Sequence, residues 1–293
     1  MERGPVVVTG ASGYIGSHIV ANLLSKGMRV RATVRDLEDP ERVAHLKSMD
    51  IAEGGDIEIV EMDLFDPESV NSAISGCTDL IHTAATVIVR SRDPQRKIVD
   101  PSVIGTRNVI SAVERSGTIE RFVHTSSTAA IRPMEWKDGS ILTADIWAND
   151  ATLENNPYGL AKVSAEKIVR DWHASLESGT RPRLVTIHPC MVFGPPLSPR
   201  HLRGSLAILM AMIRRTVPLS LPMQINIVDV RDVAEAHVRA LEEGQEGGRY
   251  LTVSGDMMMT DIAKALKKAH PGRRWATREA PYLSLIHISG AHE

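Results

Sequence analysis

Tyr158 and Lys162 are four positions apart in the stretch NPYGLAK, which spans residues 156–162. Residues at i and i+4 share one face of a helix, so the phenol and the ammonium group would lie side by side. A phenol has a pKa of about 10, and a nearby positive charge favours its ionised form. The pair is therefore suited to proton transfer, with Tyr158 as general acid toward a carbonyl oxygen and as general base in reverse. The alternative is a Tyr–Lys pair on a helix surface, because this spacing also arises by chance.

Two serines follow an apolar stretch at residues 122–125 that is typical of a buried strand. Parallel sheets place ligand sites at the carboxyl ends of their strands. The hydroxyl group of Ser126 or Ser127 would therefore be in a position to bind and orient a substrate oxygen. In the alternative interpretation, both serines only close the end of the strand.

Three glycines with the spacing GxxGxxG occur in TGASGYIG, residues 9–16, between a strand-like stretch and an amphipathic helix pattern. Gly10 permits a tight turn, Gly13 lets the backbone approach a pyrophosphate, and Gly16 lets the helix pack closely on the strand. The helix N-terminus adds amide donors and the positive end of the helix dipole. A glycine-rich turn without a ligand is the alternative. The context predicts a dinucleotide-binding cradle, which also contains Ser12, Tyr14 and Ile15.

Arg35 ends the second predicted strand, about twenty residues beyond the glycines, where enzymes selective for NAD usually carry an acid. A guanidinium group can bind a 2′-phosphate through paired hydrogen bonds, and Arg42 would supply a second cation. We therefore predict NADPH as the cofactor; NAD would be the cofactor if Asp36 bound the ribose instead. Further cofactor contacts are expected at the ends of the next strands, from Asp63, Leu64, Ala84 and Ala85.

Strands and helices must alternate to bring these stretches together, and the hydrophobic pattern predicts this alternation. Asp66, Pro67 and Glu68 are typical of a helix start, with a cap, a proline in the first turn and an early acid. Parallel pairing with right-handed crossovers then gives an α/β fold, a doubly wound parallel sheet of the Rossmann type. The expected strands are residues 6–8, 30–34, 57–62, 80–83, 122–125 and 184–187.

The prolines and glycines that follow Pro189 interrupt this alternation. We therefore predict a dinucleotide-binding domain over residues 1–189 and a smaller substrate-binding lobe over residues 190–280. Residues 225–241 are expected to return to the sheet, with Asp229 or Asp232 capping a helix. Residues 281–293 form a tail that we leave unassigned.

The composition is that of an ordinary globular protein, with 293 residues, 43% hydrophobic and 24% charged, and a net charge of −2. The balanced charge disfavours binding to nucleic acid, and no apolar run is long enough to span a membrane. Cys77 and Cys190 have no CxxC spacing, and no signal peptide is expected, so we predict a cytoplasmic location. No metal is expected, because the 11 histidines lack ligand spacing. Three of them are interpreted as core residues, namely His82, His124 and His188.

In their order, these motifs resemble the extended short-chain dehydrogenase/reductase family, within the NAD-dependent epimerase/dehydratase superfamily. The similarity runs from residue 5 to about residue 275. It is greatest for the branch of dihydroflavonol reductases, cinnamoyl-CoA reductases and related NADPH-dependent aldehyde and ketone reductases. The motifs that carry it include TGASGYIG (9–16), FVHTSS (122–127), NPYGLAKVSAEK (156–167), HPCMVFGP (188–195) and VDVRDVAEAH (228–237).

The resemblance assigns the catalytic roles to Ser127, Tyr158 and Lys162. It selects the second serine of the TSS run over Ser126. It also implies that Arg35 selects NADPH with Arg42 at a second basic position, and that Pro189 lies beside the nicotinamide. The implied function is reduction of an aldehyde or ketone, with a small-molecule carbonyl compound as substrate. Homodimers are frequent in the family, and the sequence leaves the oligomeric state open.

The sequence departs from the family pattern at two places. Residues 130–133 read AIRP where plant dihydroflavonol reductases carry an asparagine-type substrate contact, so a flavonoid substrate is not expected. Family members usually continue for several dozen residues beyond the region of Trp275, whereas residues 281–293 do not match their pattern. We therefore expect either a truncated lobe with a foreign tail or a short strand in this tail.

Two other functions share the expected fold. A nucleotide-sugar epimerase or dehydratase, or an enzyme of the 3β-hydroxysteroid dehydrogenase type, would have an overlapping set of catalytic residues. Arg35 weighs against an epimerase, which usually retains NAD⁺. A non-catalytic dinucleotide-binding protein would need only the glycine cradle, and the presence of Ser127, Tyr158 and Lys162 weighs against it.

Overall fold

The centre of the molecule is a seven-stranded sheet in which all neighbouring strands are parallel. The computed structural model describes residues 3–85, 91–135, 139–179, 181–214, 216 and 219–280, so the unassigned tail lies outside it. The strand order is β3-β2-β1-β4-β5-β6-β9, which reverses direction between β1 and β4. The strands are β1 (Val6–Thr9), β2 (Arg29–Val34), β3 (Asp56–Glu61), β4 (Asp79–His82), β5 (Arg121–Thr125), β6 (Arg183–Pro189) and β9 (Arg249–Thr252).

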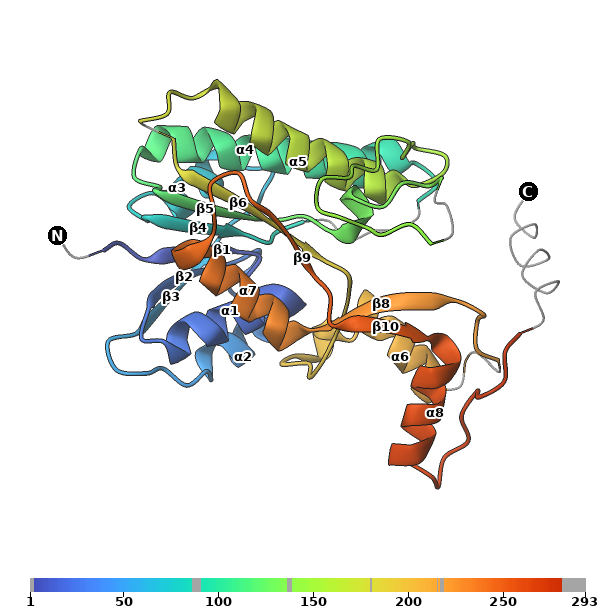
Figure 1. The fold of residues 1–293 in the computed structure, drawn as a ribbon. Coiled ribbons are helices and arrows are strands. Elements are labelled where there is room, and N and C mark those ends of the chain that lie inside the picture. Colours follow the sequence, from blue (N-terminus) through green and yellow to red (C-terminus); the bar gives the residue numbers. More distant parts are fainter. Residues whose placement is uncertain are drawn as a thin grey trace.

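Helices cover both faces of this sheet (Figure 1). One face carries α3 (Pro67–Ile74), α4 (Asp100–Ser116) and α5 (Pro157–Ser175), and the other carries α1 (Tyr14–Ser25), α2 (Pro40–Lys47) and α7 (Val230–Glu243). Successive side chains of a strand point to opposite faces. Val123 and Val185 therefore pack into one apolar core, whereas Phe122 and Leu184 pack into the other. The predicted doubly wound sheet is confirmed, and each predicted strand lies within two residues of its expected bounds.

The helix starts follow from local sequence. The side chain of Asp66 accepts a hydrogen bond from the amide of Glu68 at 3.1 Å, so α3 begins where the sequence predicts. Asp229 caps α7 by accepting from the amide of Arg231 at 2.8 Å, which settles the choice between Asp229 and Asp232. A π-helical turn, η1 (Gln95–Val99), precedes α4 directly. These caps fix where α3 and α7 begin after the strands that precede them.

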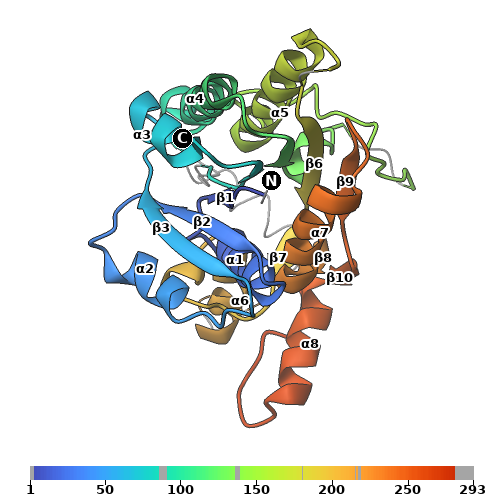
Figure 2. The same ribbon diagram turned by 90° about the vertical axis from the view of Figure 1, so that its left-hand side faces the viewer.

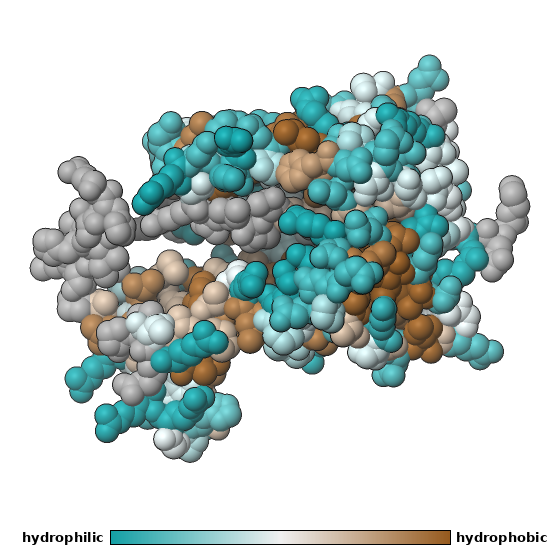
Figure 3. Space-filling view, turned by 180° about the vertical axis from the view of Figure 1, so that it is seen from behind, coloured by the Kyte–Doolittle hydropathy of each residue, from teal (hydrophilic) through white to brown (hydrophobic). Residues whose placement is uncertain are grey.

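The smaller lobe contains a three-stranded sheet in the order β10-β8-β7. Its elements are β7 (Met191–Phe193), α6 (Ser205–Arg214), β8 (Gln224–Asp229), β10 (Gly255–Met258) and α8 (Met259–Ala269). Met212, Ile225 and Ile262 belong to its apolar core. Helix α8 projects away from the large sheet (Figure 2), and apolar residues gather on this lobe where it faces the larger domain (Figure 3).

The return of the chain to the large sheet differs in extent from the predicted residues 225–241. Residues 225–229 belong to β8 and therefore to the small sheet. Helix α7 lies against α1, and β9, which the sequence pattern does not reveal, pairs with β6 as the seventh strand. The smaller lobe is therefore built from two separate segments of the chain, one before α7 and one after β9.

The histidines expected in the core are buried there. His82, His124 and His188 are each less than 5% exposed. His82 Nδ1 lies 2.7 Å from Thr9 Oγ1, and burial lowers the pKa of His82 to about 3. Within the described residues, no group of three or more acidic, histidine or cysteine side chains could hold a metal ion, and no helix is long and apolar enough to cross a membrane.

Candidate active site

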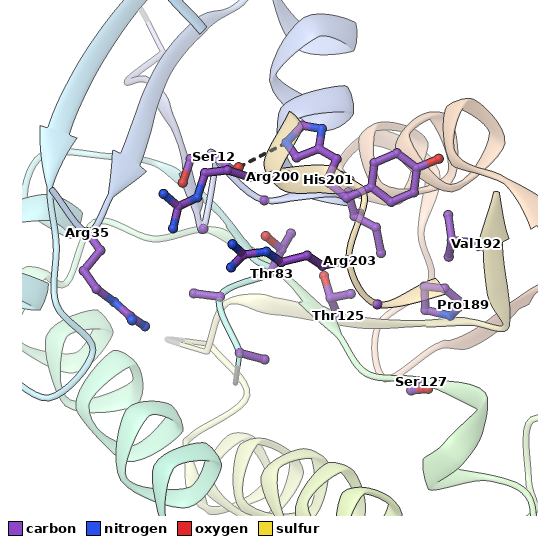
Figure 4. A pocket seen from close by; sticks show the side chains of 18 of the residues that line it. Ser12, Arg35, Thr83, Thr125, Ser127, Pro189, Val192, Arg200, His201 and Arg203 are labelled. Carbon is purple, nitrogen blue, oxygen red and sulfur yellow. Dashed lines mark hydrogen bonds between the residues drawn. The ribbon is translucent and has the colours of Figure 1, made fainter. Parts of the chain in front are cut away.

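A cavity of about 420 Å³ opens at the carboxyl ends of the parallel strands. This is the edge where doubly wound sheets bind their ligands. Its wall contains every residue predicted above to bind cofactor or act in catalysis, except Asp63. Figure 4 shows Arg35 and Arg200 toward one end of this cavity, and Ser127 and Pro189 toward the other.

The glycine loop has the shape that a dinucleotide cradle requires. Gly10 has a φ of +68°, and a Cβ atom there would lie 2.9 Å from the Cα atom of Ala84. A Cβ atom at Gly16 would lie only 2.3 Å from the carbonyl oxygen of Gly10. No side chain caps the first turn of α1, so its amide groups are available to an anion. These features fit the diphosphate of a dinucleotide.

Arginines surround the end of the cavity beyond this loop. Arg35 forms no ion pair with any residue that the structure describes. Arg42, by contrast, contacts Asp39 at 3.0 Å, and Arg200 contacts the same carboxylate oxygen at 2.8 Å. Asp36 is absent from the cavity wall, and its side chain accepts from the amide of Glu38 at 2.9 Å. Arg35 is thus the uncompensated cation at the end of β2, and Asp36 is not directed at the cavity.

Asp63 is the one predicted cofactor residue that the structure leaves off the wall. Its carboxylate accepts from the amide of Phe65 at 3.0 Å and so closes a local turn after β3. Leu64 and Phe65 line the cavity instead, and the side chain of Phe65 is half exposed there. The residue types after β3 did not reveal which side chains of this turn would face the cavity.

Ser127, Tyr158 and Lys162 all line this cavity, and Ser127 lies toward the end that carries Pro189 (Figure 4). Lys162 is buried, and its Nζ atom donates to the carbonyl oxygen of Thr125 at 3.3 Å. The side chain of Asn156 caps α5 by accepting from the amide of Gly159 at 2.9 Å. The start of α5 therefore sets the position of Tyr158 one helical turn before Lys162.

Gly159 allows α5 to begin close to the segment that follows β5. A Cβ atom at this position would lie 3.1 Å from the carbonyl oxygen of Ala129, in the short helix η2 (Thr128–Ala130). The Oγ atom of Ser127 accepts from the amide of Ala129 at 3.1 Å and caps η2. The serine and the phenol are thus held on neighbouring segments. Such an arrangement can bind a carbonyl oxygen and donate a proton to it.

Glu166 lies one helical turn beyond Lys162, and its carboxylate joins α5 to β9 and to residues at the ends of β5 and β6. Its fully buried carboxylate accepts from Ser126 at 2.8 Å and from Arg249 at 2.7 Å, and lies 2.7 Å from His188 Nε2. Burial opposes its ionisation, but the hydrogen bonds from His188 and Arg249 outweigh this and hold its pKa well below the ordinary value. The hydroxyl of Ser126 is therefore already engaged, which favours Ser127 as the serine available to substrate.

Further residues of the cavity wall were not predicted. Thr33, Thr83 and Thr125 stand at or next to strand ends, where the rule for parallel sheets could have found them. Cys190 lies next to Pro189, and burial raises the pKa of its thiol to about 11. Strand β7, the start of α6 and the segment between them also contribute to the wall, through Val192, Arg200, His201, Arg203, Gly204 and Ser205.

Comparisons with known proteins agree with this architecture. The model of the NAD dependent epimerase/dehydratase family matches residues 6–253. Cinnamoyl-CoA reductase CAD2 from Medicago truncatula is 32% identical over 296 residues, covering 97% of this chain and 87% of that protein. Dihydroflavonol 4-reductase from Hordeum vulgare is also 32% identical, covering 92% of this chain and 76% of that protein. The solved structure of Gre2 from Candida albicans in complex with NADPH has a TM-score of 0.79 and 27% identity, covering 94% of this chain and 86% of that chain.

These matches extend over most of the chain, and over most of each relative. They confirm the resemblance drawn from the ordered motifs. The relationship makes the chain an oxidoreductase that uses a nicotinamide dinucleotide in the interconversion of a carbonyl and an alcohol. The chain belongs to the NAD dependent epimerase/dehydratase family, in the branch that contains the cinnamoyl-CoA and dihydroflavonol reductases.

Proposed function

We propose that the protein is an NADPH-dependent reductase of an aldehyde or ketone. The observation that carries this proposal is a shared cavity wall, on which Ser127, Tyr158 and Lys162 lie together with the glycine cradle. A protein that only held a dinucleotide would need the cradle but not these three side chains. The reductases among its relatives support the same conclusion, and Gre2 was solved with NADPH bound.

Each residue has a distinct part in the proposed reaction. When bound, NADPH supplies a hydride to the carbonyl carbon. Tyr158 donates its phenolic proton to the carbonyl oxygen, which becomes the hydroxyl group of the product. Ser127 donates a hydrogen bond to the same oxygen, and this bond strengthens as negative charge develops there. Lys162, held by its bond to Thr125, supports the loss of the proton from the phenol and binds a ribose hydroxyl.

Arg35 is expected to determine the preference for NADPH. Arg35→Ser should raise the KM for NADPH about 10- to 100-fold, because the lost charge-assisted bonds to the 2′-phosphate contribute about 1.5–3 kcal/mol. The KM for NADH should change little, since that cofactor has no 2′-phosphate. Steady-state kinetics with both cofactors measure the effect, and Arg107→Ser, an exposed arginine of α4 outside this cavity, is the matched control. An equal loss for both cofactors would contradict this role.

The proposed function is tested with a panel of aldehydes and ketones supplied with NADPH or NADH. The purified protein should oxidise NADPH in the presence of some of these compounds, and faster than it oxidises NADH. Mass spectrometry of the nucleotide released on denaturation distinguishes the epimerase alternative. Tightly bound NAD⁺ together with no net consumption of NADPH by any carbonyl compound would overturn the proposal.

A further inference from the structure

The segment from Gly194 to Gly204, which we call the strap, connects β7 of the smaller lobe to α6. Both end glycines have positive φ values, +141° at Gly194 and +59° at Gly204, so the backbone turns sharply at each end. The strap contains one short helix, η3 (Pro199–His201). Its arginines and histidine reach the same cavity as the glycine loop, although they come from the lobe expected to bind substrate.

Polar contacts from several of its residues fasten the strap to the dinucleotide-binding domain. Ser198 Oγ donates to the carbonyl oxygen of Glu41 at 3.1 Å, and Arg200 pairs with Asp39 at 2.8 Å. His201 Nδ1 accepts from the amide of Leu197 at 3.2 Å, so its Nε2 atom carries the hydrogen and donates to the carbonyl oxygen of Ser12 at 3.2 Å. Burial lowers the pKa of His201 to about 4, which keeps the ring neutral for this contact. The strap is thus positioned directly against the glycine loop.

Arg203 is the strap residue whose charge has no counterion. Arg200 and Arg42 share the carboxylate of Asp39, whereas Arg203 forms no ion pair or hydrogen bond with any residue that the structure describes. Figure 4 shows Arg203 extending across the cavity, with its guanidinium group on the side of Ser12 and Arg35 and away from Ser127. A free guanidinium group lining a cavity is a natural partner for a phosphate group.

We propose that Arg203 binds the diphosphate of the dinucleotide from the side opposite the glycine loop. The uncapped N-terminus of α1 meets the diphosphate on one side, and the strap brings a cation to its other side. Arg35, at the end of β2, remains the ligand of the 2′-phosphate. The smaller lobe thereby contributes to cofactor affinity, and NADPH and NADH benefit equally. This inference rests on the proposed function, because it assumes that a nicotinamide dinucleotide occupies the cavity.

Calorimetric titration of the full chain with NADP⁺, NAD⁺ and ADP-ribose tests the assignment without turnover. Arg203→Met should raise the Kd of all three ligands by the same factor, about tenfold. Arg35→Ser should raise only the Kd of NADP⁺. Arg203→Lys should restore part of the affinity, since it keeps the charge but not the planar fork. Arg107→Met, on the exposed surface of α4, should leave all three values unchanged.

The outcomes separate this inference from the proposed function. If Arg203→Met leaves the Kd of NAD⁺ and ADP-ribose unchanged while wild type binds both, the diphosphate assignment is wrong and the reductase function stands. A loss confined to NADP⁺ would place Arg203 at the 2′-phosphate and would also overturn the assignment. A wild-type protein that binds none of the three ligands would refute both. Folding is checked by thermal denaturation without ligand, in which Arg203→Met should melt with wild type because exposed Arg203 forms no hydrogen bond or ion pair with a described residue.

Discussion

Tyr158→Phe should lower the rate of carbonyl reduction about 10²- to 10⁴-fold, the range that a positioned general acid contributes. The substitution removes one oxygen atom and keeps the ring, so the start of α5 and its Asn156 cap should remain intact. The Kd for NADPH should change little, because the glycine cradle and the arginines of the cavity are untouched. Single-turnover kinetics and a binding titration measure these two quantities separately.

Tyr250→Phe is the matched control for this experiment. Tyr250 lies on β9 and accepts a hydrogen bond from the amide of Gln245 at 3.1 Å, and it is not part of the cavity wall. Removal of the Tyr250 hydroxyl group should leave the catalytic rate near that of wild type. Turnover at the wild-type rate in Tyr158→Phe would exclude the phenol as the proton donor, whatever the affinity for the cofactor.

Glu166→Ala should lower the free energy of unfolding by about 3–5 kcal/mol, the usual cost of leaving buried charged partners uncompensated. Arg249 and Arg170 would lose their shared carboxylate, and Ser126 would lose its acceptor. Activity should also fall, because Ser126 directly precedes Ser127, the serine that we propose binds the substrate. Urea unfolding measures the stability, with Asp171→Ala, an exposed residue of the same helix, as the control. If Glu166→Ala and Asp171→Ala lowered the free energy of unfolding by similar amounts, the carboxylate of Glu166 would not stabilise its contacts with Ser126 and Arg249.

The contribution of Glu166 should depend on pH in a defined direction. The ordinary carboxyl pKa is about 4.3, and contacts to His188 and Arg249 hold the pKa of folded Glu166 below its ordinary value, against the effect of burial. Between the two pKa values the unfolded chain binds a proton that the folded chain does not, so acid favours unfolding. The stability advantage of wild type over Glu166→Gln should therefore be full at pH 7 and should shrink at pH 3. An advantage independent of pH would contradict this linkage.

Local sequence signals predicted the parts of the molecule that depend on local physics. The spacing of the three glycines follows from steric limits within one turn, and the cap Asp66 acts on an amide two residues away. The alternation of strands and helices is also a local signal, because the hydrophobic pattern of each short stretch indicates which of the two it forms. The glycine loop, the helix that carries Tyr158 and Lys162, and the doubly wound sheet could therefore be predicted without coordinates.

The contacts that the sequence did not reveal join distant parts of the chain. Glu166 meets Arg249 across 83 residues, and His201 meets Ser12 across 189 residues. Strand β9 has only four residues, and none of them is buried, so no apolar run marked it. The position of Asp63 off the cavity wall has a different reason, because its carboxylate accepts a local hydrogen bond in the turn after β3. Residue type alone does not tell whether a strand-end carboxylate faces a ligand or its own backbone.

The chain enters the smaller lobe after β6, returns to the large sheet with α7 and β9, and enters the lobe again. One cleavage of the chain therefore cannot separate the dinucleotide-binding domain from the smaller lobe. A fragment ending at Pro189 would lack α7, which covers part of one face of the large sheet with Val233, Val238 and Leu241 buried. It would also lack β9 and so leave the backbone edge of β6 open to pairing with other chains. Aggregation of such a fragment would follow from this exposed surface. The dinucleotide-binding half is therefore not a detachable module. Recombination between relatives must exchange the segment before α7 and the segment after β9 together.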